Sequence, residues 1–100
     1  MPELIPNEKF ASDLERIRSN KALLKKIAKC MLFLEQNPSH PGLNLERIVN
    51  DPAAWSARVD WKYRLSFEPS AYRESGAPDW THPIKLLRVL DHEDLYKNPH

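Results

Sequence analysis

The sequence predicts an α+β fold: a small, mostly antiparallel β-sheet with an N-terminal two-helix hairpin packed on one face. Three observations support this. Apolar residues recur with helical spacing between residues 10 and 34. From Trp55 to Phe67 they alternate with polar residues at a period of two, as in strands. Segment 84–90 is almost continuously apolar, which indicates an interior strand covered on both faces. The chain has 100 residues, so we interpret 1–100 as one domain.

The first part of the chain predicts a short strand followed by a helical hairpin. Asparagines precede both predicted helices, where their side chains accept backbone N–H groups as N-caps. The second helix is expected to end before Pro38, because the residue before a proline is pushed out of the helical region. The segments are a strand at 4–5, a helix after Asn7 with the stripe Phe10, Leu14 and Ile17, and a helix from about Lys21 to Gln36 capped by Asn20.

The next part predicts a β-hairpin whose register can be derived. After a loop at 39–45, segment 45–49 is expected to be a short strand or a turn. The apolar residues of 55–59 and 63–67 share one face only if an odd number of residues connects the strands. The three-residue loop 60–62 meets this condition and places Arg58 opposite Arg64 on the polar face of two half-buried strands. Opposed like charges are mildly destabilising, and a bound anion or a nearby carboxylate would relieve them.

The last part predicts a long loop, the interior strand and a closing turn. Loops as long as 69–83 are uncommon in compact domains and are often functional or mobile. If 91–96 is helical, His92 and Tyr96 lie on one face, because they are four residues apart. Cys30 is expected in the core, since it shares a helix face with apolar residues.

Composition excludes several classes of function. Fifteen Lys and Arg against fourteen Asp and Glu give a net charge of +1, so nucleic-acid binding must rest on local geometry rather than bulk charge. No run approaches the ~18 apolar residues of a membrane span, and no basic segment with an apolar stretch forms a secretion signal. With a single cysteine, this predicts a cytoplasmic protein. Two glycines form no phosphate loop, and no Cys/His cluster has zinc-ligand spacing, so we expect neither cofactor nor metal.

Five short segments together resemble the RelE/ParE superfamily of toxins from toxin–antitoxin modules. Their order and rough spacing match across nearly the whole chain. The resemblance implies the α+β fold described above. For the RelE-type branch it implies metal-free cleavage of mRNA in the ribosomal A site, in which the RNA 2′-hydroxyl attacks the adjacent phosphate and leaves a cyclic phosphate and a free 5′-hydroxyl. The segments are His-Pro-Gly-Leu at 40–43, Trp-Ser-Ala-Arg-Val at 55–59, Tyr-Arg-Leu at 63–65, Leu-Leu-Arg-Val at 86–89 and His-Glu-Asp-Leu-Tyr at 92–96.

The resemblance also implies roles for individual residues. Arg64 would hold the scissile phosphate and Arg58 would assist, because a guanidinium fork suits phosphate oxygens. His92 would act as acid or base, since histidine titrates near neutral pH. Tyr96 would stack on a base or assist proton transfer. Further substrate contacts are expected from His40, Lys62 and Arg88.

Other interpretations stay open at this point. The same fold serves ParE-type gyrase inhibitors, which act by binding protein, and a catalytically silent RelE-like domain would only bind another protein. The two hairpin arginines would in that case pair with nearby carboxylates, and Tyr96 would seal the core. Every toxin interpretation implies a small, partly disordered antitoxin as partner. The nuclease interpretation adds the ribosome and its mRNA.

Overall fold

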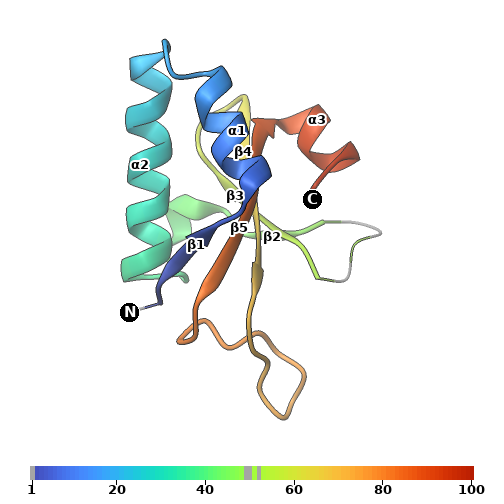
Figure 1. The fold of residues 1–100 in the computed structure, drawn as a ribbon. Helices are drawn as coiled ribbons and strands as arrows, with labels where there is room; N and C mark the ends of the chain where they lie inside the picture. The colour runs from blue at the N-terminus through green and yellow to red at the C-terminus, as the bar shows by residue number, and fades with distance from the viewer. Residues whose placement is uncertain (1, 49–50, 52) are drawn as a thin grey trace.

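The computed structural model describes residues 2–48, 51 and 53–100. Over these residues the chain forms three α-helices, a short 3-10 turn and a five-stranded sheet in the order β1-β5-β4-β3-β2 (Figure 1). β1 is parallel to β5, and the other neighbouring strands are antiparallel, which confirms the predicted fold class. The elements are β1 (Leu4–Pro6), α1 (Glu8–Arg16), α2 (Lys21–Gln36), the 3-10 turn η1 (Pro41–Leu43), β2 (Glu46–Arg47), β3 (Trp55–Arg58), β4 (Tyr63–Pro69), β5 (Ile84–Asp91) and α3 (His92–Lys97).

The helix boundaries follow from side-chain caps. The Asn7 side chain accepts the backbone N–H of Phe10 at 2.8 Å, and Asn20 accepts that of Leu23 at 3.1 Å. Both predicted N-caps are therefore confirmed, and each satisfies a backbone donor that the first helical turn leaves unpaired. α3 begins in the same way, because its N-cap Asp91 accepts a backbone N–H at 3.0 Å.

The main core lies between the two N-terminal helices and one face of the sheet. Phe10 of α1 and Leu34 of α2 are fully buried there with Leu65 and Phe67 of β4. Cys30 belongs to this cluster, as predicted, and burial raises the pKa of its thiol to about 12. The thiol is therefore protonated at neutral pH and is no nucleophile. None of the described helices is long and apolar enough to cross a membrane.

The hairpin formed by β3 and β4 has the predicted register. Trp55 lies opposite Phe67, and Arg58 lies opposite Arg64. The turn is fixed by Asp60, whose Oδ1 accepts the backbone N–H groups of Lys62 and Tyr63 at 2.9 and 2.6 Å. β5 is interior, as expected, because it lies between β1 and β4.

The centre of the second face of the sheet is buried, although Arg58 at its margin is exposed, so the prediction of half-buried strands is wrong. Ser56, Arg64 and Ser66 on that face are 0%, 6% and 0% exposed. α3 packs against β4 and β5, and the Ser66 hydroxyl donates to the Pro99 carbonyl at 2.6 Å. An alternating pattern does not reveal this cover, because the polar side chains beneath it are hydrogen-bonded rather than hydrated.

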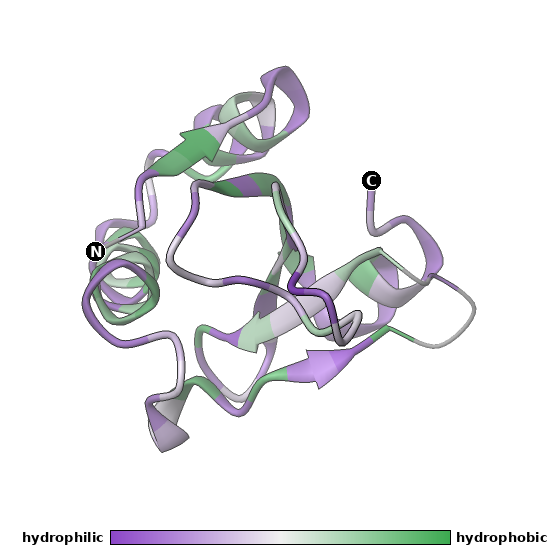
Figure 2. Cartoon of the chain, turned by 90° about the horizontal axis from the view of Figure 1, so that it is seen from below, coloured by the Kyte–Doolittle hydropathy of each residue, from purple (hydrophilic) through white to green (hydrophobic). Residues whose placement is uncertain are grey.

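The two edges of the sheet differ in chemistry. Figure 2 shows β1 as hydrophobic and β2 as hydrophilic. β2 covers two residues of the segment 45–49 that was expected to be a strand or a turn, and Val49 lies outside the described residues. A short charged strand such as Glu46–Arg47 is a poor template for pairing with another chain.

Beyond the end of β1, a side chain takes the place of a strand along β5. β1 pairs with β5 only as far as Leu86. Past that point Asp13 of α1 accepts the backbone N–H of Val89 at 3.0 Å. The same carboxylate accepts two hydrogen bonds from Arg88, at 2.8 Å from Nε and 2.9 Å from Nη2. Asp13 is 2% exposed, so a largely buried ion pair joins α1 to β5 of the sheet.

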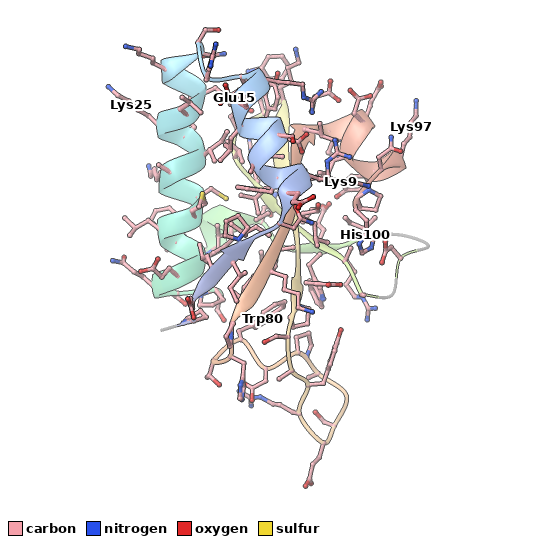
Figure 3. The ribbon with its side chains drawn as sticks, in the orientation of Figure 1. Lys9, Glu15, Lys25, Trp80, Lys97 and His100 are labelled. Carbon is pink, nitrogen blue, oxygen red and sulfur yellow. The ribbon has the colours of Figure 1, made fainter. Side chains whose placement is uncertain are left out.

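The long loop between β4 and β5 is anchored by one aromatic residue. Trp80 lies where the loop meets the sheet (Figure 3). Its ring makes an edge contact with Trp55 at 5.7 Å between centroids and a tilted contact with Phe67 at 5.4 Å. Tyr72 of the same loop is 53% exposed.

Replacing Trp80 with alanine is expected to lower the free energy of unfolding by about 2 kcal/mol, below the range for a fully buried tryptophan because Trp80 is only partly buried. Urea denaturation measures the loss. Tyr72→Ala is the matched control and is expected to change stability by less than about 0.5 kcal/mol. Equal losses in the two variants would show that Trp80 does not anchor the loop.

Candidate functional site

A closed network of polar side chains lies between β2, β3, β4 and α3. Nε of Arg64 donates to Oγ of Ser56 at 3.0 Å. Oη of Tyr96 lies 3.1 Å from that Oγ and 2.5 Å from Oε2 of Glu46. Arginine only donates and a carboxylate only accepts, so the hydrogen bonds run from Arg64 through Ser56 and Tyr96 to Glu46. An ion pair of 4.0 Å between Arg64 Nη2 and Glu46 closes the ring.

The guanidinium of Arg64 is fixed in place by backbone carbonyls. Its Nη2 donates to the Asn44 carbonyl at 2.7 Å and to the Ser56 carbonyl at 3.4 Å. Asn44 ends η1 with φ of 49°, a left-handed conformation in which asparagine is enriched. The long ion pair with Glu46 neutralises the buried cation only in part. A positive charge held in advance at a fixed position is suited to stabilising an anion.

α3 contributes two aromatic rings to the same site. His92 and Tyr96 lie on one helix face, as predicted, with ring centroids 4.5 Å apart. Burial and the hydrogen bond to Glu46 raise the pKa of Tyr96 above its ordinary value, so the hydroxyl is protonated and donates at neutral pH. His92 is exposed, and its backbone N–H donates to the Lys62 carbonyl at 2.8 Å.

The remaining predicted residues are distributed over three places. Lys62 and His92 line a hollow of about 320 Å³ beside the network. Arg58 and His40 line a separate pocket between α2 and β3 and make no hydrogen bond to the network. Arg88 is bound to Asp13, on the α1 edge of the sheet. The structure thus brings Arg64, His92 and Tyr96 together with Lys62 nearby, and it does not bring the other three to them.

Two members of the network, Ser56 and Glu46, were not among the residues predicted from the sequence. Ser56 lies on the same polar face as Arg58, so the alternation of β3 held a usable signal for it. Glu46 comes from a two-residue strand, and nothing in its local sequence distinguishes it from a solvated glutamate. Within the described ranges, no group of three or more His, Cys, Asp or Glu side chains is placed to hold a metal ion.

The arrangement has the groups that acid–base chemistry at a phosphodiester requires. Arg64 supplies a fixed cation, and Glu46 supplies a carboxylate that is 51% exposed on its side chain and accessible to a ligand. His92 adds an exposed imidazole next to Tyr96. An exposed proton acceptor and an exposed imidazole therefore lie around a buried, charge-stabilising guanidinium.

Comparisons with known proteins concern the fold. The sequence significantly matches no protein-family model and no curated protein. Among solved structures, YafQ in the Escherichia coli DinJ–YafQ complex superposes with a TM-score of 0.71 at 12% identity, covering 95% of this chain and 98% of that one. A YoeB/ParE toxin from Agrobacterium tumefaciens gives 0.69 at 16%, covering 90% and 98%. YoeB from a Staphylococcus aureus dimer gives 0.68 at 17%, covering 91% and 97%.

These similarities extend over nearly the full length of both partners in each comparison. At such low identity they concern backbone architecture and not individual side chains. They agree with the resemblance drawn from the sequence segments. The chain therefore has the fold of RelE-like toxins.

Proposed function

We propose that this chain is the toxin of a toxin–antitoxin module and that it cleaves mRNA on the ribosome. The observation that carries the proposal is the buried, carbonyl-fixed guanidinium of Arg64 beside the Glu46 carboxylate and the ring pair of α3. A purely protein-binding domain has no need of a buried cation with an incomplete counter-charge, because desolvating a charge is costly.

The proposed reaction uses the RNA's own 2′-hydroxyl. Oε1 of Glu46, to which no described residue hydrogen-bonds, takes the proton of the 2′-hydroxyl. The 2′-oxygen forms a bond to the adjacent phosphorus while the bond from phosphorus to the 5′-oxygen breaks. Protonated His92 gives its proton to the departing 5′-oxygen, and Arg64 stabilises the negative charge on the phosphoryl oxygens. The products are a 2′,3′-cyclic phosphate and a 5′-hydroxyl.

The proposed function requires two partners, an antitoxin and the ribosome with its mRNA. Solved neighbours of this fold include the DinJ–YafQ and YoeB–YefM complexes. We therefore propose a small antitoxin as the partner of this chain, and the ribosome with its mRNA as the target. Co-purification of the chain with the product of an adjacent gene tests the first partner. Recovery of the chain alone from such co-expression counts against it.

The test of function is induced expression in bacteria with mapping of mRNA 5′ ends. The wild type is expected to arrest growth and to produce new ends inside coding frames, which need phosphorylation by a kinase before ligation because they carry 5′-hydroxyls. Glu46→Gln is expected to lower the cleavage rate about a hundred-fold, since it removes the proton acceptor.

Glu74→Gln in the β4–β5 loop is the matched control and is expected to cleave like the wild type. New ends carrying 5′-phosphates would contradict the mechanism. Growth arrest without new ends, together with inhibited supercoiling by purified gyrase, would favour the ParE-type function. A soluble, folded chain without toxicity would favour the silent binding domain.

A further inference from the structure

A positively charged pocket lies beside the Arg64 network. It has a volume of about 420 Å³ and lies between α2, η1 and the end of β3. Lys26 and Lys29 of α2 line it together with Arg58 of β3. Among the described residues of its lining, Asp60 is the only acidic one. The lining therefore carries three cations against one carboxylate.

The carboxylate of Asp60 pairs with only one of these cations, Lys26. Its Oδ1 accepts two backbone N–H groups of the hairpin turn, and Oδ2 lies 3.7 Å from Lys26 Nζ. The Lys29 ammonium lies over the ring of Phe33, 5.7 Å from the centroid. Arg58 hydrogen-bonds to no described residue, and it lies opposite another cation in the β3–β4 register. The pocket thus has an excess of positive charge that an anion would compensate.

His40 adds a neutral donor of fixed orientation. Its Nδ1 accepts the backbone N–H of Gly42 at 2.9 Å, so the ring proton is on Nε2. The ring stacks on Phe33, with centroids 4.1 Å apart and planes 11° from parallel. The pocket lining therefore combines a guanidinium, two ammonium groups and an imidazole N–H, all of which donate to phosphate oxygens.

Two chain segments connect this pocket to the Arg64 network. The turn that contributes His40 and Gly42 ends at Asn44, whose carbonyl holds Arg64. β3 contributes Ser56 to the network and, two residues later, Arg58 to the pocket. We infer that the pocket binds a backbone phosphate of the RNA neighbouring the scissile one, an inference that rests on the proposed function.

The test measures binding of a 2′-O-methylated RNA pentanucleotide, which cannot be cleaved, by fluorescence anisotropy at several salt concentrations. Each phosphate contact contributes about 0.7 to the slope of log affinity against log salt. Lys29→Gln and Arg58→Gln are each expected to reduce the slope by about that amount. Lys25→Gln, an exposed neighbour on α2 that does not line the pocket (Figure 3), is expected to leave the slope unchanged.

Gly42→Ala provides a second, charge-free test. A Cβ at this position would lie 3.0 Å from Cε1 and Nδ1 of His40, so the ring must shift by a few tenths of an ångström from the orientation that its bond to Gly42 fixes. Weaker binding of the pentanucleotide with an unchanged salt slope is expected. Thermal melting of each variant separates this effect from loss of the fold.

The outcomes that overturn the inference are distinct from those that overturn the function. Absence of pentanucleotide binding, or an equal loss of salt slope in Lys25→Gln and Lys29→Gln, overturns the inference that the pocket binds a phosphate. Binding of a polyglutamate peptide with the pocket-dependent slope, but not of RNA, assigns the pocket to an acidic protein segment instead. If cells show new mRNA ends but the pocket variants show unaltered salt slopes, the proposed function stands and phosphate binding by the pocket is refuted. If the variants show the expected salt slopes but cells show no mRNA cleavage, phosphate binding by the pocket stands and the proposed function is refuted.

Discussion

Arg64→Gln is expected to slow mRNA cleavage about a thousand-fold. Arginines that stabilise phosphoryl transition states account for rate factors of about 10³ to 10⁵. Glutamine removes the charge from a site where backbone carbonyls fix the guanidinium in advance. Single-turnover cleavage of a ribosome-bound mRNA measures the effect.

A conservative variant and a remote one distinguish chemistry from folding. Arg64→Lys keeps the charge but loses the planar fork, so we expect partial activity between those of the wild type and Arg64→Gln. Arg73→Gln removes an exposed arginine of the β4–β5 loop and is expected to cleave normally. Arg64→Gln also leaves the Asn44 carbonyl without its donor, at a cost of about 1–3 kcal/mol of stability, so each melting temperature must be recorded. Full activity of Arg64→Gln would remove the residue from the mechanism.

Asp13→Asn is expected to cause the largest loss of stability, about 3 kcal/mol. An asparagine turns an N–H₂ group toward donors of Arg88 or Val89 and leaves the Arg88 charge unpaired. Breaking a buried ion pair costs about 3–5 kcal/mol, and the lower figure applies because Arg88 is 17% exposed and can reach water. Urea denaturation at pH 7 measures the loss.

The same pair predicts a pH dependence. Burial alone would raise the pKa of Asp13, but hydrogen bonds from Arg88, Val89 and Arg16 outweigh it and hold this pKa below its ordinary value of 3.8. A carboxyl group with a lowered folded pKa stabilises the fold fully above its unfolded pKa, and the contribution is lost as the pH falls through the folded value. The stability gap between wild type and Asp13→Asn is therefore expected to be constant above about pH 5 and to shrink below about pH 4.

Glu15→Gln on the same helix is the control. Glu15 pairs with Arg18 on the exposed side of α1, and both side chains are more than half exposed (Figure 3). Exposed pairs contribute less than about 1 kcal/mol, so this variant is expected to unfold almost like the wild type. If the stability difference between the wild type and Asp13→Asn stays unchanged at low pH, Asp13 acts by packing and not by charge.

Local rules accounted for most of the fold. The caps at Asn7 and Asn20 and the register of Arg58 against Arg64 depend on residues close in the chain. The parallel pairing of β1 with β5 and the burial of the polar sheet face depend on contacts between distant segments. No periodicity records such contacts. Asp13 did carry a signal, because it lies three residues after Phe10 on the apolar face of its helix.

The candidate site was predictable where the resemblance named residue types, and not where the tertiary structure decides partners. Arg64, His92 and Tyr96 come together through the hairpin and the closing helix. Glu46 enters only because β2 pairs with β3 and brings its carboxylate to the Tyr96 hydroxyl. Arg88 carries the same charge as Arg64, yet a carboxylate from α1 binds it, which a linear pattern does not reveal.

The partnership of the first strand with the last has a consequence for how the chain is made. Leu4 has no strand partner until Ile84 has been synthesised, and Asp13 has no partner on the sheet until Arg88 and Val89 follow. Translation adds about 5–20 residues per second, so the apolar faces of α1 and α2 remain without their sheet for several seconds. A nascent chain of this protein therefore exposes these apolar faces until β5 has been translated. An enzyme with the proposed function, which attacks translating ribosomes, would thus complete its own sheet only after a ribosome has translated β5.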